Sequence, residues 1–371
     1  MISAFAWQGR ICATRFCVSY ATCSTVTELY KTTVQKFIQH SISEPEESAR
    51  YLLSHAANIE YRLSVFKSNG NRILNKQQLA TLETCVHRRL AREPIQYIIG
   101  NWDFYGFEVK CRPPVLIPRP ETEQLVDLIL SNVKKEKLRI LDIGCGSGVI
   151  GIALLTQLPH ATCVSIDIDS TAVTLTRENV ENVLCRDCSK AEAGTSPDGQ
   201  WHCCRVAVQR SCVADFCSSQ DVIGKFDLIV SNPPYIPSAD LLGLAPEVRV
   251  FESPLALDGG RDGLDVVRQV LALTSGLLSA RGTRELWMEV SHTHPEAIRH
   301  LLTDGYGLCG GGSVLEEGRG AEEVNPPDSV QMVEQKSQLE GQGISSGYGY
   351  EFVEGLQDGY GSPRFVRLRA L

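Results

Sequence analysis

The sequence predicts an α/β fold with a mostly parallel, doubly wound sheet and a small N-terminal helical domain. Three observations predict it. Helix and strand patterns alternate after residue 124, a glycine-rich turn follows the first buried strand, and residues 28–92 show helical spacing of apolar residues. The alternating elements are expected as helix 125–133, strand 138–143, helix 148–158, strand 161–168, helix 170–183, strand 226–231, helix 264–278 and strand 285–290.

Length, composition and charge limit the classes of function. The chain has 371 residues, enough for two domains, and 43% of them are hydrophobic and 22% charged. With 36 basic and 44 acidic residues the net charge is -8, so a strong basic surface for a nucleic-acid backbone is not expected. No apolar run approaches the roughly 18 residues that a membrane span requires. The 14 cysteines form no regular framework and are expected to be mostly reduced thiols, with no metal site.

The first segment, residues 1–27, differs in composition from the rest. It contains Arg10 and Arg15, lacks acidic residues, and is rich in Ser, Thr, Ala and Cys. Such a leader is typical of a mitochondrial transit segment and predicts a location in the matrix. A disordered N-terminus without a targeting role is the alternative.

The remaining chain divides by its helix, proline and glycine patterns. In the helical domain, Asn75 is expected to cap a helix, and Gly106 is expected to turn a short hairpin in a proline-rich linker. Two stretches without periodicity are interpreted as surface insertions. The expected segments are a helical domain at 28–92, a linker at 93–123, and a main domain at 124–371 with insertions near 184–210 and 310–349.

A glycine-rich loop follows the predicted strand 138–143. Gly144, Gly146 and Gly148, with Cys145 and Ser147 between them, permit a tight turn and a close backbone approach to a ligand. Asp167 ends the next strand, where a carboxylate can accept both ribose hydroxyls of a nucleoside. These residues predict a nucleoside pocket at the carboxyl edge of the sheet.

The loop alone leaves the nucleoside open. Residues 146–151 also satisfy a dinucleotide fingerprint, so a nicotinamide cofactor is one candidate. The acidic Asp142 fits a neutral or cationic ligand better than a pyrophosphate. Led by Asp142, the loop resembles the S-adenosylmethionine loop of class I methyltransferases.

A second motif, Asn232-Pro233-Pro234-Tyr235, directly follows the strand 226–231. An amide nitrogen is a poor nucleophile, and a site helps it by accepting hydrogen bonds from its N–H groups. The Asn232 side-chain oxygen and the Pro233 carbonyl are the candidate acceptors, the prolines fix the direction of that carbonyl, and Tyr235 can stack on the planar amide. The motif therefore predicts methyl transfer to a planar nitrogen.

Three other functions stay open at this point. The exocyclic amine of adenine is also a conjugated planar nitrogen, so the alternative is an N6-adenine methyltransferase acting on DNA or RNA. The acidic charge balance and the helical domain count against it. If the protein were a nicotinamide-dependent oxidoreductase, residues 232–235 would have no role. If it were a non-catalytic binding module, neither the glycine loop nor residues 232–235 would have one.

The sequence resembles the HemK/PrmC family, which methylates the glutamine of the Gly-Gly-Gln motif in class I peptide-chain release factors. The resemblance rests on the glycine loop, Asp167, the Asn-Pro-Pro-Tyr motif and four further segments. Those segments are Arg-Glu-Pro-Ile-Gln-Tyr-Ile-Ile-Gly at 92–100, Phe-Tyr-Gly at 104–106, Val-Leu-Ile-Pro-Arg-Pro-Glu-Thr-Glu at 115–123 and Gly-Ser-Pro-Arg-Phe-Val at 361–366. The segments 182–215 and 310–349 depart from the family pattern.

The resemblance implies a class I, Rossmann-like methyltransferase fold, S-adenosylmethionine as cofactor, and a mitochondrial release factor as the protein substrate. It implies that the helical domain grips the release factor, and no membrane or direct nucleic-acid partner is expected. The implied catalytic residues are Asn232, Pro233 and Tyr235. The implied cofactor-binding residues are Gly144, Cys145, Gly146, Ser147, Gly148, Asp167 and Asn232. The implied substrate-binding residues are Asn232, Pro233, Pro234, Tyr235, Arg119 and Glu121.

Overall fold

The computed structural model describes residues 24–134, 137–185, 194–195, 201–203, 205–304 and 347–371, which belong to two compact units. The helical unit comprises the described residues up to Asn101 together with Ala245–Phe251, and the catalytic unit comprises the described residues of Trp102–Leu244 and Glu252–Leu371. The helical unit thus extends beyond the predicted boundary at residue 92 and includes residues 245–251, which were expected in the main domain. The leader, residues 1–27, lies almost wholly outside the described residues.

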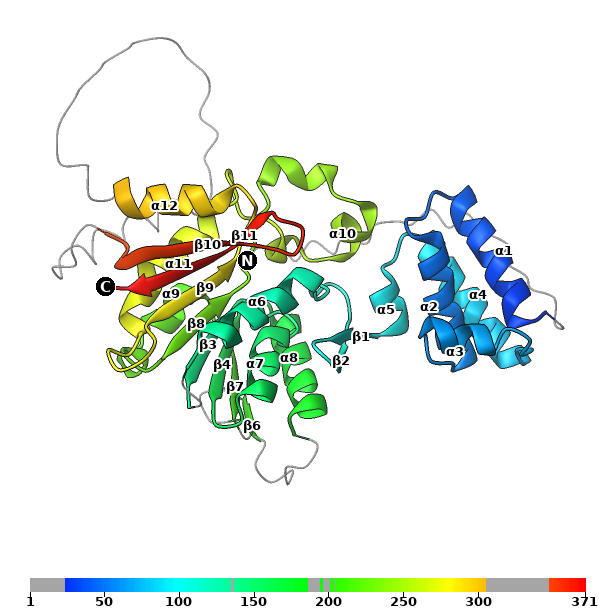
Figure 1. The fold of residues 1–371 in the computed structure, drawn as a ribbon, viewed down its shortest axis with the longest axis horizontal. Helices are drawn as coiled ribbons and strands as arrows, with labels where there is room; N and C mark the ends of the chain where they lie inside the picture. The colour runs from blue at the N-terminus through cyan, green and yellow to red at the C-terminus, as the bar shows by residue number, and fades with distance from the viewer. Residues whose placement is uncertain (1–23, 135–136, 186–193, 196–200, 204, 305–346) are drawn as a thin grey trace, which may run out of the picture. The chain divides into compact units, whose positions relative to one another are not determined.

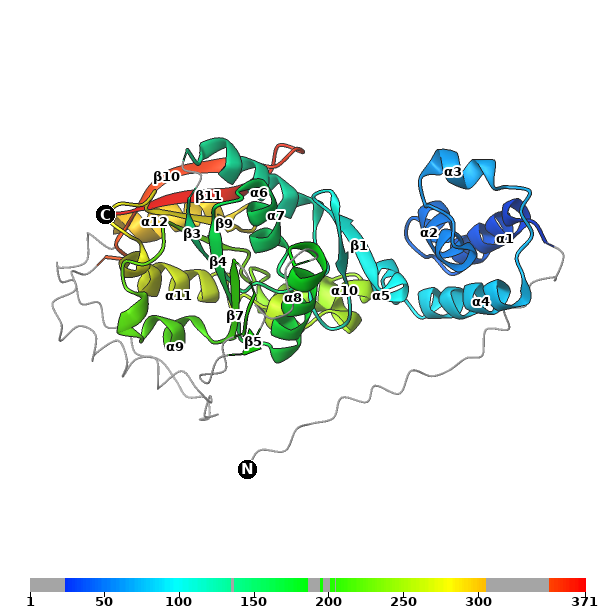
Figure 2. The same cartoon turned by 90° about the horizontal axis from the view of Figure 1, so that it is seen from below.

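Helices make up the helical unit: α1 (Val26–Gln39), α2 (Pro45–Ala57), α3 (Leu63–Ser68), α4 (Lys76–Leu90), α5 (Ile95–Ile99) and α10 (Pro246–Phe251) (Figure 2). Asn75 caps α4 as predicted. Its side-chain oxygen accepts from the Gln78 backbone N–H at 2.9 Å, and the Gln78 side chain accepts from the Asn75 N–H at 3.1 Å. The apolar faces meet around Phe37, Leu53 and Leu82, which are fully buried.

A buried ion pair ties α10 to α4 within this unit. Arg89, whose side chain is 4% exposed, donates to Glu247 at 3.0 Å, and Arg92 donates to the same carboxylate oxygen at 3.3 Å. Burial opposes the ionisation of Glu247, but the backbone N–H and Arg89 outweigh it and hold its pKa below the ordinary value. The pair therefore explains why a segment distant in sequence belongs to the helical unit.

Replacing Glu247 by alanine is expected to destabilise the helical unit by about 3 kcal/mol, because Arg89 is left buried without its counter-charge. The change in the free energy of unfolding can be measured by denaturant titration, with hydrogen exchange of the α4 amides as the probe of the helical unit. Glu60, in the exposed pair with Arg62, provides the control. Glu60→Ala should change stability by less than about 0.5 kcal/mol, and an equal effect of both substitutions would contradict the role of the buried pair.

The catalytic unit is built on one large sheet (Figure 1). Among the described residues it contains nine strands in the order β10-β11-β9-β8-β3-β4-β7-β6-β5. The five neighbours from β9 to β7 pair in parallel, and the outer strands pair antiparallel. The strands are β3 (Arg139–Ile143), β4 (Thr162–Asp167), β5 (Gly194–Thr195), β6 (Trp201–Cys203), β7 (Val206–Arg210), β8 (Leu228–Ser231), β9 (Glu285–Glu289), β10 (Tyr350–Gln357) and β11 (Pro363–Ala370), and a separate hairpin joins β1 (Asn101–Phe104) to β2 (Phe107–Lys110).

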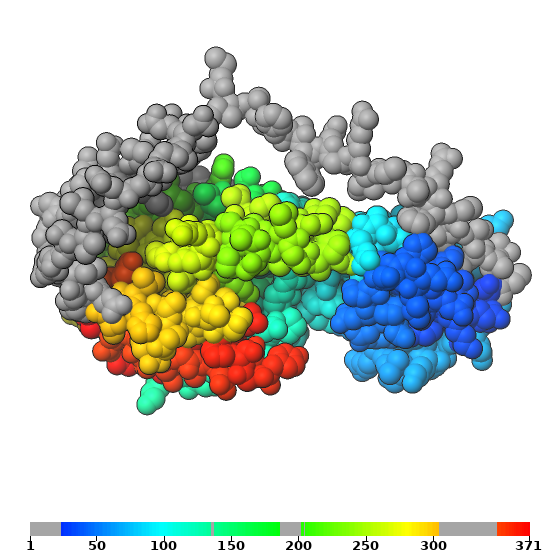
Figure 3. Space-filling view, turned by 90° about the horizontal axis from the view of Figure 1, so that it is seen from above, coloured from blue at the N-terminus to red at the C-terminus, as the bar shows by residue number. Residues whose placement is uncertain are grey.

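Helices cover both faces of the sheet (Figure 1). One face carries α6 (Pro120–Asn132), α7 (Val149–Gln157) and α8 (Ser170–Val183). The other carries α9 (Val213–Cys217), α11 (Asp265–Thr274) and α12 (His294–Asp304), which pack with the strands in one apolar core. Figure 3 shows α12 and the C-terminal strands forming one continuous surface, in orange and red. The α/β fold with a mostly parallel, doubly wound sheet is confirmed.

The structure corrects parts of the sequence analysis. Residues 206–210, assigned to an insertion, form β7 and extend the parallel sheet beside β4. Cys185 and Cys203 are paired as a disulfide, and the six other described cysteines are free thiols, which agrees with the expectation of mostly reduced cysteines. Helix α6 begins earlier than expected, because Pro120 occupies its first turn, where the missing N–H has no helical partner. Most of the segment 310–349 lies outside the described residues. Among the described helices, none is both long enough and apolar enough to cross a membrane.

Candidate active site

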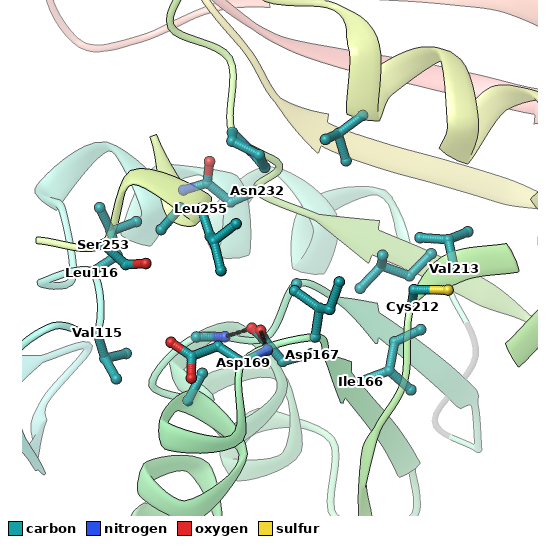
Figure 4. Close-up of a pocket in the computed structure, with 18 of the residues that line it drawn as sticks. Val115, Leu116, Ile166, Asp167, Asp169, Cys212, Val213, Asn232, Ser253 and Leu255 are labelled. Atoms are coloured by element: carbon teal, nitrogen blue, oxygen red, sulfur yellow. Dashed lines mark hydrogen bonds between the residues drawn. The ribbon is translucent and has the colours of Figure 1, made fainter. Parts of the chain in front are cut away.

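A cavity lies at the carboxyl ends of the central parallel strands (Figure 4). Five of the residues predicted for the site line it: Gly144, Gly146, Asp167, Asn232 and Pro234. The other lining residues come mainly from the strand ends, the linker and the segment after the acceptor motif: Val115, Leu116, Ile143, Ile166, Ile168, Asp169, Ala172, Ser211, Cys212, Val213, Ser253, Leu255, Ala256, Val266 and Gln269.

The glycine loop brings the backbone to the cavity wall. Gly144 and Gly146 have φ of 69° and 57°, and a Cβ built at either would meet no protein atom within 4 Å. Gly148 also has positive φ, at 82°, but a Cβ there would lie 2.8 Å from the Thr176 side chain. The first two glycines therefore leave room for a ligand, and the third permits close packing on α8.

Cys145 and Ser147 lie in the loop but their side chains are buried. Burial raises the pKa of the Cys145 thiol, whose sulfur lies 3.4 Å from the Thr176 hydroxyl oxygen. The Ser147 carbonyl accepts from the Asn179 side chain at 2.9 Å. Their environment suits a structural part in holding the loop against α8.

Asp167 joins the glycine loop to the end of β4. One carboxylate oxygen accepts from the Gly146 N–H and the other from the Asp169 N–H, each at 2.9 Å (Figure 4). Burial raises the pKa of Asp167, and these backbone hydrogen bonds oppose the rise. Each oxygen keeps a further lone pair for a ligand hydroxyl.

The cavity wall also contains residues that the sequence analysis did not assign. Ser211, Cys212 and Val213 follow β7 directly, so their place depends on a strand that the cysteine-rich surroundings concealed. Val115 and Leu116 come from the linker. Recognising β7 as a strand would have placed residues 211–213 at the same sheet edge as Asp167.

The acceptor motif begins at the end of β8, where the Ser231 hydroxyl donates to the Ile143 carbonyl at 2.8 Å. Asn232 and Pro234 line the cavity. Gly263 packs against the end of the motif, and a Cβ there would lie 2.4 Å from the Tyr235 carbonyl oxygen. The glycine therefore allows a close approach that fixes the path of the loop.

The buried carboxylate of Glu289 is linked to both polar side chains of the motif, to Tyr235 directly and to Asn232 through Thr122. Asn232 Nδ2 donates to Thr122 Oγ1 at 3.4 Å, and the Thr122 hydroxyl donates to Glu289 Oε2 at 2.8 Å. The Tyr235 hydroxyl lies 3.4 Å from Glu289 Oε1 and accepts from Arg364 at 3.3 Å. Burial, followed by the charge of Glu289, raises the pKa of Tyr235 to about 12, so the phenol stays protonated near neutral pH.

The two predicted linker residues stand at the start of α6. Arg119 donates to both oxygens of Glu252, at 2.7 and 2.6 Å, and the Glu252 side chain is 1% exposed. Glu121 lies in the first turn of α6, and its charge contributes to the raised pKa of Glu289 after the larger effect of burial. Arg119 is thus paired within the catalytic unit, next to Ser253 of the cavity wall.

Two family models and several curated proteins match this chain. Residues 28–100 match the PrmC N-terminal domain and residues 121–194 match the methyltransferase small domain. The chain is 38% identical to the release factor glutamine methyltransferase of Geobacter sulfurreducens over 62% of this chain and 72% of that protein. A solved structure of a putative RNA methyltransferase from Pyrococcus horikoshii aligns at 12% identity over 69% of this chain and 86% of that chain, with a TM-score of 0.35.

The human protein named MTRF1L release factor glutamine methyltransferase is 35% identical over 288 residues, which are 75% of this chain and 80% of the human one. The helical unit itself matches the PrmC N-terminal domain over residues 28–100. This chain therefore belongs to the release factor glutamine methyltransferase family.

Proposed function

We propose that this protein transfers a methyl group from S-adenosylmethionine to the side-chain amide nitrogen of the glutamine in the Gly-Gly-Gln motif of a mitochondrial class I release factor. The single observation that carries the proposal is the shared cavity. Asn232 of the acceptor motif lines the same cavity as Gly144, Gly146 and Asp167. Family membership supports the reaction and the substrate class.

The residues on the donor side fit S-adenosylmethionine, which supplies an electrophilic methyl group when bound. Gly144 and Gly146 leave open space where side chains would stand, and the free lone pairs of Asp167 suit ribose hydroxyls. Apolar side chains such as Leu116 and Val213 suit the flat face of an adenine ring.

On the acceptor side, Asn232 Oδ1 and the Pro233 carbonyl accept hydrogen bonds from the N–H groups of the glutamine amide. These contacts favour the charge that develops on the nitrogen as it reacts, and they hold it in line with the methyl group. The Tyr235 ring packs on the planar amide, with its hydroxyl end held by Glu289 and Arg364. The helical unit supplies further binding to the release factor, because one amide group offers little binding energy.

A methyl-transfer assay tests the function directly. The purified protein is offered an intact release factor, a Gly-Gly-Gln peptide, or a duplex and a single-stranded DNA, each with labelled S-adenosylmethionine. We expect label on the glutamine nitrogen of the intact factor, much less on the peptide, and none on DNA. Label on adenine N6 would replace the proposal by the adenine alternative.

We also propose that residues 1–27 direct the protein into mitochondria, because they carry Arg10 and Arg15 and no acidic residue. A fusion of these residues to a fluorescent protein is expected to accumulate in mitochondria. The matched control replaces both arginines by glutamate, which should keep the fusion in the cytosol. Cytosolic fluorescence of the unmodified fusion would contradict the location.

A further inference from the structure

We propose that Thr122 and Glu289 are positioning residues that fix the orientation of the Asn232 amide, so that its oxygen rather than its nitrogen is presented to the methyl acceptor. The inference deepens the proposed function and rests on it. Neither residue belongs to the acceptor motif. Thr122 lies in the first turn of α6, and Glu289 ends β9.

The orientation of an asparagine amide depends on its hydrogen-bond partners, since its oxygen and nitrogen ends have nearly the same shape. A glutamine substrate presents N–H donors, so only the Asn232 oxygen can accept from it. If the side chain were turned by 180°, two sets of N–H groups would face each other, and the contact would be repulsive.

Thr122 selects between the two orientations because its hydroxyl has a single hydrogen. That hydrogen is directed to Glu289 Oε2 at 2.8 Å. Thr122 Oγ1 therefore has only lone pairs left for Asn232, and it accepts from Nδ2 at 3.4 Å. A turned Asn232 would place its own oxygen against these lone pairs.

Glu289 is suited to fix the direction of the Thr122 hydroxyl. The residue is only 1% exposed, so water does not compete for its carboxylate oxygens. One oxygen accepts from Thr122 and the other faces the Tyr235 hydroxyl, so a single carboxylate orients both ends of the acceptor motif. Burial raises the pKa of Glu289, whereas the Thr122 hydrogen bond and the Arg364 charge act in the opposite direction and stabilise its carboxylate form.

A carboxamide cannot replace Glu289 in this arrangement. Glutamine has one accepting oxygen and one donating NH₂ group, whereas both Thr122 and Tyr235 direct hydrogens toward residue 289. The Tyr235 oxygen already accepts from Arg364, so a donating NH₂ group at residue 289 would add a second donor to it and leave the phenol hydrogen without its carboxylate acceptor. Glu289→Gln therefore disturbs either the Asn232 end or the Tyr235 end, although it preserves the side-chain volume.

The test compares Thr122→Val with Thr122→Ser in the full-length protein. Valine matches the shape of threonine but removes the hydroxyl, and serine keeps the hydroxyl. We expect Thr122→Val to lower kcat for release-factor methylation about tenfold, the scale of one lost hydrogen bond, with little change in KM. Thr122→Ser should keep kcat close to that of the wild type, and Glu289→Gln should lower it at least as much as Thr122→Val. Equilibrium binding of S-adenosylmethionine checks that each variant is folded.

A second substitution separates positioning from a general effect on the fold. In an Asn232→Ala background, Thr122→Val should cause no further loss of kcat, because the amide that it orients is gone. Equal kcat for Thr122→Val and Thr122→Ser, or an undiminished loss in the Asn232→Ala background, would overturn the positioning role. A wild-type protein that leaves the glutamine unmethylated would overturn the proposed function itself, so the two failures are distinguishable.

Discussion

Replacing Asn232 by alanine is expected to lower kcat for release-factor methylation about 10²–10³-fold, while binding of the release factor stays nearly unchanged. The magnitude is that of losing one preorganised polar contact to the charge that develops in a transition state. The contact is strongest as the amide nitrogen becomes positive, so its loss affects turnover more than binding. Steady-state kinetics with the intact factor, together with equilibrium binding of the factor, measure the two effects separately.

Asn232→Asp serves as the comparison for that substitution. Aspartate keeps an oxygen for the substrate N–H but cannot donate to Thr122 Oγ1, whose hydrogen is already directed to Glu289. We expect its kcat to lie between those of the wild type and Asn232→Ala. Wild-type kcat in the alanine variant would show that the acceptor contact is unimportant and would remove the chemical basis of the proposed reaction.

Local signals predicted much of the fold. Helical spacing together with the Asn75 cap predicted α4, and short segments rich in apolar residues predicted β3, β4, β8 and β9. The strand β7 was missed because cysteine and glycine residues around 184–204 interrupt every period. Local sequence also could not show that α10 belongs to the helical unit, since this depends on an ion pair between Arg89 and Glu247.

The sequence predicted only part of the cavity, because tertiary packing brings some of its residues together. Gly144, Gly146 and Asp167 follow strands, so the rule for carboxyl ends of parallel strands placed them together. Glu289 also ends a predicted strand, but no local signal marks Thr122 as its partner. Thr122 bonds to Glu289 across 167 positions of sequence, and only the packing of α6 against β9 brings them together.

Replacing Asp167 by alanine is expected to weaken S-adenosylmethionine binding by about 1.5–3 kcal/mol, the scale of lost hydrogen bonds to a charged group. The variant loses acceptors for the ribose hydroxyls, and it also loses the bond that holds Gly146 in the glycine loop. Calorimetry at constant pH measures the affinity. Unchanged affinity would remove Asp167 from the cofactor site.

The pH dependence of Asp167 gives a sharper test than its removal. The ionised carboxylate accepts from the ribose, so affinity for S-adenosylmethionine should fall as the pH falls through the pKa of Asp167. Because burial raises this pKa, the loss should begin at a higher pH than for an ordinary aspartate.

Asp167→Asn should bind weakly at every pH, since its NH₂ group would face the N–H of either Gly146 or Asp169. Asp142, whose pKa burial raises to about 7, is unchanged in that variant, so the variant also shows how much Asp142 contributes to the pH dependence of binding. If the asparagine variant keeps the full pH dependence, the titrating group is Asp142 or another residue, and Asp167 does not bind the ribose as a carboxylate.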